Sequence, residues 1–312
     1  MQQATVIRSN SARPMCVLDI GGTKLAAGLM TADNRINSRQ EAPTLAHEGA
    51  DAILERLIQL GKRLLQQCSE DNYPAAIGVA TGGQVDPLTG QVVHATDNIP
   101  GWTGLTLAEK LAAALHLPTV VENDANCFAL AEAVLGAGQG YKHLLVVAIG
   151  TGVGAGIVID GKLYSGWQGK AGEVGHVCVK ATNGRPCTCG RSGCLESYTA
   201  SRIIVANSDF PTIQAVAAAY QAGEQIAAVD EAADWLGFGL ASFAHVLGPE
   251  AIVVGGSVGL LGERYLERVR ESYHCHAMFS YQSISILAAT LAADSGLLGA
   301  GILARQLLAK TP

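Results

Sequence analysis

The sequence predicts an α/β fold of two lobes, and three observations lead to this prediction. A strand–turn–strand pattern occurs at residues 17–30 and again at 146–159, with four of 14 aligned positions identical. Each copy opens its own half of the chain, in which apolar strands alternate with helical segments, as in α/β proteins. The length of 312 residues suits two domains at the usual ~100–200 residues each.

Apolar periodicity and turn residues place the elements of the first half in order. The copy at 17–30 gives an apolar strand, a Gly-Gly-Thr turn and a second strand. We then expect a turn at 31–34, a third strand, a helix over 50–67, a strand at 75–80, a helix over 105–115, a strand at 119–121 and a helix ending at Leu135.

These segments predict how the chain is divided. Residues 1–14 form a flexible polar arm, and residues 15–123 form a small α/β lobe. Residues 124–298 form a larger α/β lobe that carries a metal-binding loop. A final alanine- and leucine-rich helix begins at Leu297, and its residues from about 299–312 join the small lobe.

Composition excludes several classes of protein. The net charge is 21 − 27 = −6, and a phosphate backbone is bound by basic surface, so we expect no nucleic-acid partner. Charged residues make up 15% of the chain, against a typical ~25%, and hydrophobic residues make up 49%. This composition excludes disorder and predicts a large core, with further surface covered in a homodimer.

Hydropathy argues against a membrane protein. The longest apolar run, residues 144–159, has 16 residues and four glycines, whereas a helical span needs ~20 apolar residues. Residues 1–14 lack the apolar stretch of a signal peptide. We therefore expect a cytoplasmic protein without a membrane partner, whose eight cysteines are thiols or metal ligands.

The most specific motif is a metal-ligand pattern of one histidine and three cysteines: His176, Cys187, Cys189 and Cys194. Four N and S ligands satisfy tetrahedral Zn²⁺ and leave no position for water, so the predicted site is structural. The alternative is that the cysteines are buried small hydrophobes. The polar, glycine-rich segment 183–194 disfavours it. We expect burial for the other cysteines in apolar surroundings: Cys16, Cys68, Cys127 and Cys178.

Two glycine turns are candidates for binding phosphate. The first contains Asp19, Gly21, Gly22, Thr23 and Lys24, where an acid at a strand end and a following turn could hold Mg²⁺ and wrap a phosphate. The second, at 150–154, includes Thr151 and Gly152. Either turn alone has an ordinary explanation, because glycines are common in hairpins. Together the two turns, one in each lobe, favour a nucleoside triphosphate as ligand.

Acidic residues supply the candidate catalytic groups. Asn123 and Asp124 follow an apolar strand and start a helix, so either can be a simple N-cap. A carboxylate at that position can also accept a hydroxyl proton during phosphoryl transfer. Glu173 and Glu196 flank the metal loop, where they are either solvated acids or ligands for sugar hydroxyls.

Taken in order, these motifs resemble the ROK family (repressors, open reading frames and sugar kinases). The resemblance covers residues of about 15–305. It rests on Asp-x-Gly-Gly-Thr at 19–23, Glu-Asn-Asp at 122–124, Gly-Thr-Gly-x-Gly at 150–154, Glu-x-Gly-His at 173–176 and Cys-x-Cys-Gly-x-x-Gly-Cys-x-Glu at 187–196. The resemblance implies a two-lobed actin/hexokinase-like ATPase fold of the ribonuclease H-like type, with a zinc-binding loop that shapes the sugar pocket.

The resemblance also implies roles for individual residues. Asp124 would be the catalytic base. The sugar would be contacted by Gly83, Asn123, Asp124, Glu173, His176 and Glu196. The ATP site would be lined by Asp19, Gly21, Gly22, Thr23, Lys24, Thr151, Gly152, Gly255 and Gly256. Loss of zinc should then remove sugar binding and leave ATP binding largely intact.

We therefore expect an ATP- and Mg²⁺-dependent kinase for the 6-hydroxyl of an amino sugar, most like the family's bacterial N-acetylmannosamine kinases of sialic acid catabolism. Residues 19–27, 252–260 and 294–300 resemble those kinases. Residues 98–102 resemble the family's glucokinases, and residues 123–130 resemble its N-acetylglucosamine kinases, so these two activities are the alternatives.

A sugar-responsive transcriptional regulator is the alternative from another class. Family members of this kind carry an N-terminal DNA-binding domain. The 18 residues before Asp19 are too few for a helix-turn-helix, and the net charge is negative. We therefore expect the enzyme.

Overall fold

The computed structural model describes residues 13–96, 99–291 and 294–310. Contacts divide the chain into two compact units. Unit 1 comprises Met1–Cys127, Gly166–Lys170 and Ala293–Pro312, and unit 2 comprises Phe128–Ser165 and Ala171–Ala292. Among the residues described, there is no helix both long and apolar enough to cross a bilayer.

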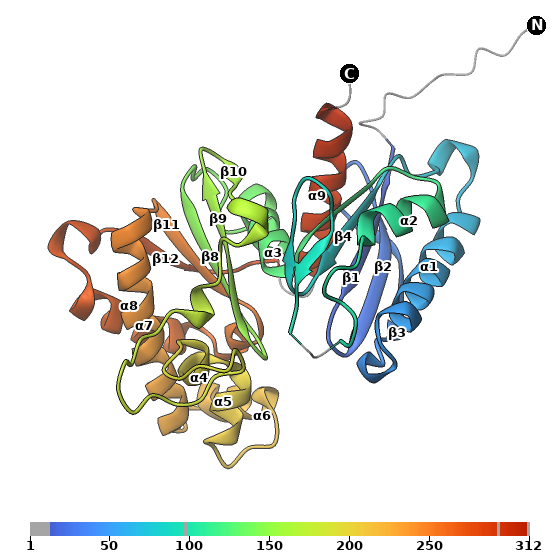
Figure 1. The fold of residues 1–312 in the computed structure, drawn as a ribbon. Coiled ribbons are helices and arrows are strands. Elements are labelled where there is room, and N and C mark those ends of the chain that lie inside the picture. The colour runs from blue at the N-terminus through green and yellow to red at the C-terminus, as the bar shows by residue number, and fades with distance from the viewer. Residues whose placement is uncertain (1–12, 97–98, 292–293, 311–312) are drawn as a thin grey trace, which may run out of the picture. The chain divides into compact units, whose positions relative to one another are not determined.

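Unit 1 is built on a mixed sheet with the strand order β3-β2-β1-β4-β7 (Figure 1). β1 pairs antiparallel with β2 and parallel with β4, which in turn pairs parallel with β7. The strands are β1 (Met15–Ile20), β2 (Lys24–Met30), β3 (Ile36–Pro43), β4 (Ile77–Thr81) and β7 (Thr119–Asn123), and a small hairpin is formed by β5 (Gln84–Val85) and β6 (Val92–His94).

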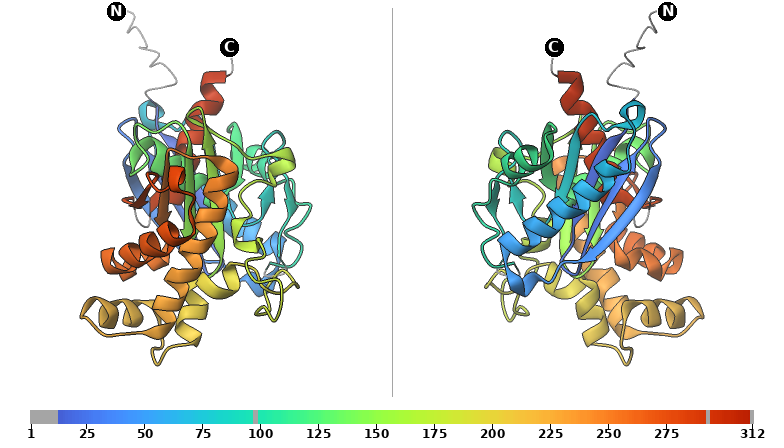
Figure 2. Two further views of the ribbon diagram at one scale, coloured as in Figure 1. Left: turned by 90° about the vertical axis from the view of Figure 1, so that its left-hand side faces the viewer. Right: turned by 90° about the vertical axis from the view of Figure 1, so that its right-hand side faces the viewer.

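Helices cover both faces of this sheet, which is why β1 and β4 are almost entirely buried and mostly apolar. α1 (Ala50–Gln66) and α2 (Leu107–Leu115) share one core with Leu18 and Val79. Figure 2 shows α1 lying across the strands. α9 (Ser295–Lys310) covers the opposite face, where its backbone closely approaches β4.

Unit 2 repeats this plan with the strand order β10-β9-β8-β11-β12. Its strands are β8 (Leu144–Ile149), β9 (Val153–Ile159), β10 (Lys162–Leu163), β11 (Ala251–Gly255) and β12 (Ser285–Ala288). One face packs against α3 (Asp124–Leu135). The other packs against a core supplied by α5 (Ser201–Ala206), α6 (Ile213–Gln221), α7 (Ala227–Leu247) and α8 (Glu263–His276), and α4 (Glu196–Thr199) packs against α7.

The internal repeat predicted from the sequence is present in the backbone. The hairpin of β1 and β2 closes with Ile20 opposite Leu25, and that of β8 and β9 closes with Ile149 opposite Val153. In both units the first strand of the hairpin also pairs parallel with the next strand of its sheet, β4 or β11. The mixed α/β fold class is confirmed.

Local differences from the sequence predictions have simple causes. Residues 1–12 of the predicted arm lie outside the described residues, but Arg13 and Pro14 bond to the chain around Tyr73 and Ala75. Cys16 and Cys127 are buried as predicted, whereas Cys178 is exposed and Cys68 is half-buried. The prediction for Cys178 was wrong because its apolar neighbour Val177 is itself exposed.

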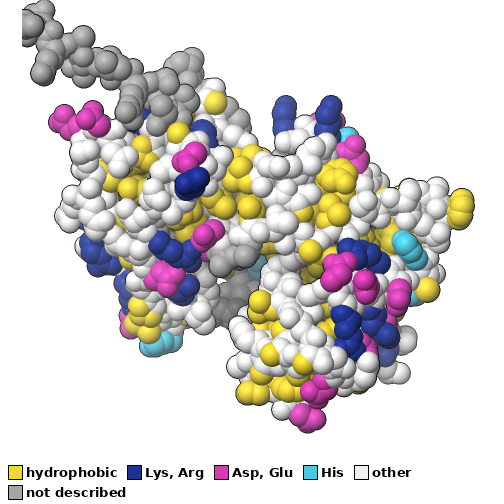
Figure 3. Space-filling view, turned by 180° about the vertical axis from the view of Figure 1, so that it is seen from behind, with side chains coloured by type: hydrophobic (Ala, Val, Ile, Leu, Met, Phe, Trp, Pro, Cys, Tyr) yellow, Lys and Arg dark blue, Asp and Glu magenta, His cyan; other side chains and the backbone are white. Residues whose placement is uncertain are grey.

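Charged side chains of both signs are mixed on one face of the molecule. On the face drawn in Figure 3, Lys and Arg side chains lie beside Asp and Glu side chains. Ion pairs of this kind include Arg268–Asp234 and Arg185–Glu231. Such mixing is typical of a surface that does not bind polyanions through a uniform basic field.

Candidate functional site

In unit 1, the candidate residues come together at one edge of the sheet. β1, β4 and β7 run parallel, and their register aligns Ile20 with Thr81 and Thr81 with Asn123. The carboxyl ends of the three strands therefore meet at one edge, where open α/β sheets bind ligands. Asp19 is the penultimate residue of β1, and Asp124 follows β7 directly.

Asn123 joins two parts of this edge. Its Oδ1 accepts a hydrogen bond from the Asn126 amide at 3.1 Å. Asn123 is therefore the N-cap of α3, which was one of the two interpretations of the sequence. Its Nδ2 donates to the Gly83 carbonyl at 2.9 Å, which fixes the turn after β4 against the start of α3. The sequence analysis gave no role to Glu122 of the Glu-Asn-Asp motif. This residue is buried, and its Oε1 accepts hydrogen bonds from the Asn123 amide and from Asn126 Nδ2.

Asp124 is the exposed first residue of α3. Its Oδ1 accepts a hydrogen bond from the Ala125 amide at 2.8 Å. The first amide groups of a helix carry partial positive charge, so the start of α3 is a suitable place for an acidic side chain. An accessible carboxylate held in this way can accept a proton from a bound hydroxyl group.

The carboxyl of Asp19 is strongly perturbed by its surroundings. Burial, and after it the charge of the nearby Asp124, raise the pKa of its carboxyl to about 6, against the opposing charges of Arg39 and Lys24. Its Oδ2 lies against Gly296 in the first turn of α9, where a Cβ would be only 3.1 Å away. Two acids so placed are a natural site for a cation, since a cation removes their mutual repulsion.

We expect the Asp19→Asn variant to be more stable than the natural protein near neutral pH. The folded-state pKa of Asp19 is raised from 3.8 to about 6, so folding favours the protonated acid. That contribution to stability is present below about pH 4 and is lost as the pH rises through about 6. The variant should therefore gain about 2–3 kcal/mol in the free energy of unfolding at pH 7.5.

Urea unfolding of both proteins in Mg²⁺-free buffer measures this gain. The stability difference should shrink as the pH is lowered toward about 4, which serves as an internal control. An Asp19→Asn variant that is less stable than the natural protein at pH 7.5 would show that the acid is held by favourable contacts.

The other residues of the first glycine turn, residues 20–24, occupy a tight hairpin. The Gly21 amide donates to the Lys24 carbonyl at 3.0 Å, and Thr44 Oγ1 donates to the Gly21 carbonyl at 2.7 Å. Gly22 and Thr23 are exposed at the tip. Lys24 Nζ lies 2.9 Å from Glu41 Oε1 on β3, so its ammonium group forms an ion pair across the sheet. The roles of these residues toward a nucleotide stay predictions.

In unit 2, the second glycine turn, residues 150–154, lies at the corresponding edge. β8 and β11 run parallel with Ala148 opposite Gly255, so the turn after β8 and the Gly255-Gly256 turn are neighbours. Ser257 Oγ donates to the Ile149 carbonyl at 3.5 Å. Thr151 is exposed at the tip, as a phosphate-binding residue must be.

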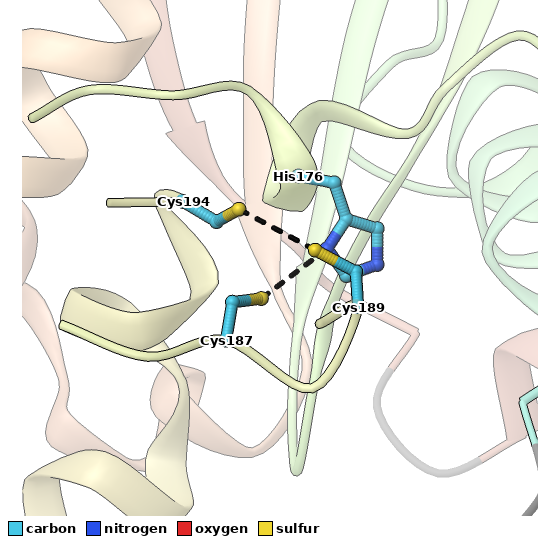
Figure 4. A group of neighbouring side chains, drawn as sticks. All are labelled: His176, Cys187, Cys189 and Cys194. Atoms are coloured by element: carbon cyan, nitrogen blue, oxygen red, sulfur yellow. Dashed lines mark hydrogen bonds between the residues drawn. The ribbon is translucent and has the colours of Figure 1, made fainter. Parts of the chain in front are cut away.

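The predicted metal ligands form a cluster in unit 2 (Figure 4). One ligand atom from each of His176, Cys187, Cys189 and Cys194 lies within 4.8 Å of the others. Cys187 Sγ lies 3.5 Å from His176 Nδ1, and Cys189 Sγ lies 3.6 Å from Cys194 Sγ. His176 comes from a short 3₁₀ turn, Val174–His176, and the cysteines come from the end of the same segment, which we call the metal loop, residues 176–194.

These distances fit tetrahedral zinc. At ordinary bond lengths two zinc-bound thiolates lie about 3.8 Å apart, and a thiolate and an imidazole nitrogen lie about 3.6 Å apart. The pKa of Cys189 is lowered, chiefly by a hydrogen bond from the Arg191 amide. Burial raises the pKa of Cys194 to about 12. A divalent cation would permit all three thiolates at once, so the donor set suits Zn²⁺.

The two acids that flank the metal loop differ in their surroundings. Glu173 is exposed, one turn before His176. Glu196 is buried and accepts hydrogen bonds from the Val153 amide, Thr188 Oγ1 and Arg202 Nη2. The sequence analysis missed Thr188 and Arg202, although the position of Thr188 between two metal ligands was a signal for it.

The structure thus assembles two groups of predicted residues. Unit 1 brings Asp19, Gly83, Asn123 and Asp124 to one sheet edge. Unit 2 brings the four metal ligands, Glu196 and the second glycine turn together.

Comparisons with known proteins all lead to one family. Residues 15–307 match the model of the ROK family. A glucokinase of Halalkalibacterium halodurans is 34% identical, over 93% of this chain and 94% of its own. An N-acetylmannosamine kinase of Salmonella typhi is also 34% identical, over 92% of this chain and 97% of its own. A ROK family glucokinase from Streptomyces griseus, solved with glucose and AMPPNP, is similar at 32% identity with a TM-score of 0.81, over 94% of this chain and 99% of its own.

Proposed function

The chain belongs to the ROK family, and from that premise we propose that it transfers the γ-phosphate of ATP to the 6-hydroxyl of a hexose or N-acetylhexosamine. We propose further that unit 1 corresponds to the small lobe and unit 2 to the larger lobe of such a kinase. The similar glucokinase solved with AMPPNP supports ATP as the phosphate donor.

The observation that carries this proposal is the sheet edge of unit 1. Asp124 lies close enough to Asp19 for its charge to raise the pKa of Asp19. The carboxyl of Asp19 lies beside the first turn of α9, and Asp124 is the first residue of α3. Phosphoryl transfer requires a proton acceptor for the hydroxyl and a cation for the phosphate charge. Two neighbouring acids with different surroundings suit these two tasks.

The residues of unit 1 would act as follows. The Asp124 carboxylate would accept the proton of the 6-hydroxyl while that oxygen attacks the γ-phosphorus and the bond to the β-phosphate oxygen breaks. Asn123, fixed by Gly83 and by the cap of α3, would orient the sugar. Asp19 would hold Mg²⁺, which supplies charge neutralisation at the phosphates when bound.

The residues of unit 2 would bind the other groups. Amide groups of the second glycine turn and of the Gly255-Gly256 turn would hold phosphate oxygens, as glycine-rich turns do in other phosphate sites. The metal loop would present Glu173 and His176 to sugar hydroxyls. When bound, zinc supplies the rigidity that a loop without an apolar core lacks.

N-acetylmannosamine, used in sialic acid catabolism, is the substrate that we propose, and glucose is the second candidate. The Salmonella typhi enzyme supports the first and the Halalkalibacterium halodurans enzyme the second, each at 34% identity. The segments at 252–260 and 294–300 favour N-acetylmannosamine. The glucokinase-like segment 98–102 favours glucose, and its Asn98 lies outside the described residues.

The substrate prediction is tested by kcat/KM for N-acetylmannosamine, N-acetylglucosamine and glucose in a coupled assay of ADP release. We expect the highest value for N-acetylmannosamine. A pocket that pairs its polar groups with an axial N-acetyl group leaves one unpaired with the C2 epimer, which costs ~1–3 kcal/mol, or about 5- to 150-fold in kcat/KM.

Higher kcat/KM with glucose or N-acetylglucosamine would contradict the substrate assignment and leave the kinase class intact. ADP release without any of these sugars is the control for background ATP hydrolysis. Lack of sugar-dependent ADP release with a wide set of hexoses would contradict the kinase itself.

A further inference from the structure

The buried carboxylate of Glu196 joins the metal loop to the second glycine turn. Its Oε2 accepts a hydrogen bond from the Val153 amide of that turn at 3.0 Å. Its Oε1 accepts a hydrogen bond from Thr188 Oγ1 at 2.7 Å, and Thr188 lies between Cys187 and Cys189. The Glu196 side chain is only 7% exposed, so these hydrogen bonds form largely out of water, where they are strongest.

Arg202 makes a second connection to the same turn. Its Nη2 donates to Glu196 Oε1 at 3.1 Å, and its Nε donates to the Thr151 carbonyl at 2.9 Å. A planar guanidinium holds two acceptors in a fixed relation, which the ammonium of lysine cannot do. Arg202 therefore ties the tip of the second glycine turn to the acid beside Cys194.

Close backbone packing adds a third connection. A Cβ on Gly175, next to the metal ligand His176, would lie 2.2 Å from the Val153 carbonyl oxygen. A Cβ on Gly152 would lie 2.8 Å from Glu196 Oε2. Only glycines permit this approach. The carbonyl of Val153 therefore packs against the neighbour of a metal ligand, and its amide bonds to Glu196, which in turn bonds to Thr188 between two ligands.

We infer that Arg202 is a positioning residue that, through Glu196 and Thr188, couples occupancy of the zinc site to the shape of the second glycine turn and hence to nucleotide binding. This inference rests on the proposed function for its consequence in catalysis. An ordered metal loop holds Thr188 and Glu196, and these hold the amide of Val153 and the carbonyl of Thr151. Zinc and nucleotide therefore raise each other's affinity by the same factor.

The first test compares steady-state kinetics of three variants with the zinc-loaded natural enzyme. Arg202→Gln should raise the KM for ATP by about tenfold, and should change the KM for the sugar by less than about threefold, because two hydrogen bonds of a partly exposed cation are lost. Arg202→Lys should recover little of this loss. An unchanged KM for ATP, or a loss confined to the KM for the sugar, would overturn the inference.

Arg268→Gln is the matched control. Arg268 has the same pattern of partners, with Nη2 on the Asp234 carboxylate and Nε on the Asp230 carbonyl, and is 40% exposed against 34% for Arg202. Its partners lie on α7, so its loss should leave the KM for ATP unchanged. A rise equal to that of Arg202→Gln would indicate a general loss of stability and contradict the specific role.

The second test needs no turnover. Zinc affinity is measured by competition with a chelator, with and without a non-hydrolysable ATP analogue. The analogue should raise the apparent zinc affinity of the natural protein by about tenfold and that of Arg202→Gln by less than about threefold. Equal coupling in both proteins would overturn the inference.

Hydrogen exchange tests the coupling through Arg202 separately from the proposed kinase function. Removal of zinc should speed exchange of the Val153 amide, and Arg202→Gln should do so with zinc still bound. Full protection of this amide in both cases would overturn the network. An enzyme that fails to phosphorylate sugars but shows these exchange changes would contradict the proposed function and leave the coupling standing.

Discussion

Replacing Asp124 by asparagine should lower kcat by about 10²- to 10⁴-fold, the usual range for loss of a general base. Asparagine has nearly the same shape and can still accept from the Ala125 amide, but it cannot take the proton of the 6-hydroxyl. Sugar affinity, measured by calorimetry in the absence of ATP, should fall far less than kcat.

Asp51→Asn is the control for the effect of a charge at a helix N-terminus. Asp51 lies in the first turn of α1, as Asp124 does in α3, and it is exposed. Asp51→Asn should lower thermal stability slightly, by the removal of a favourable interaction with the helix dipole. Near-normal turnover of Asp124→Asn would return Asp124 to the interpretation as a helix-capping acid.

Removal of zinc should have the second large effect. Elemental analysis of the purified protein should find about one Zn²⁺ per chain, because the donor set closes a tetrahedral site. Zinc binding supplies on the order of 10–16 kcal/mol in small peptides. Cys189→Ser should therefore lose most of the zinc, disorder the metal loop and reduce sugar phosphorylation by at least about a hundredfold.

The structure changes what this experiment should show for the nucleotide. The sequence analysis treats the metal loop and the glycine turns as separate motifs, and so expects ATP binding to survive the loss of zinc. Because Glu196 contacts both the metal loop and the Val153 amide, nucleotide affinity should fall as well, though less than sugar affinity.

Cys178→Ser is the matched control for the loss of a thiol. Cys178 lies on the same loop, but its thiol is exposed and does not belong to the cluster of four ligands. This variant should keep its zinc and its activity. Active natural protein that contains no zinc would contradict the structural role of the metal.

The fold could be predicted from local patterns to a large extent. The largely apolar runs at 17–20 and 146–149, each followed by a glycine turn, predict hairpins because glycine allows the tight turn and apolar side chains must be buried. The helix expected at 50–67 is α1, Ala50–Gln66, since its apolar residues recur with helical spacing. Some boundaries differ from the prediction by a few residues, as at Ser295, where α9 begins two residues before the expected start.

The candidate site could be predicted in part. Ligand spacing identifies the metal cluster because soft donors in a polar, glycine-rich segment have few other uses. Spacing does not identify Arg202 or Thr188, whose partners are set by how separate segments pack. Nor does it show that Cys178 is exposed, because burial depends on what the rest of the chain covers.

The sequence by itself determined the fold class, the repeated hairpins, the metal ligands and the family, since each depends on residue types at short spacing. Only the tertiary structure decided that Asp19 is desolvated beside Asp124, and that Glu196 connects the metal loop to the second glycine turn. These properties depend on distances between residues that are far apart in the chain. Such distances are fixed by the parallel register of β1, β4 and β7 and by the packing of Gly175, next to the metal ligand His176, on β9. They matter because pKa values and hydrogen bonds respond to neighbours in space, whatever their separation in the sequence.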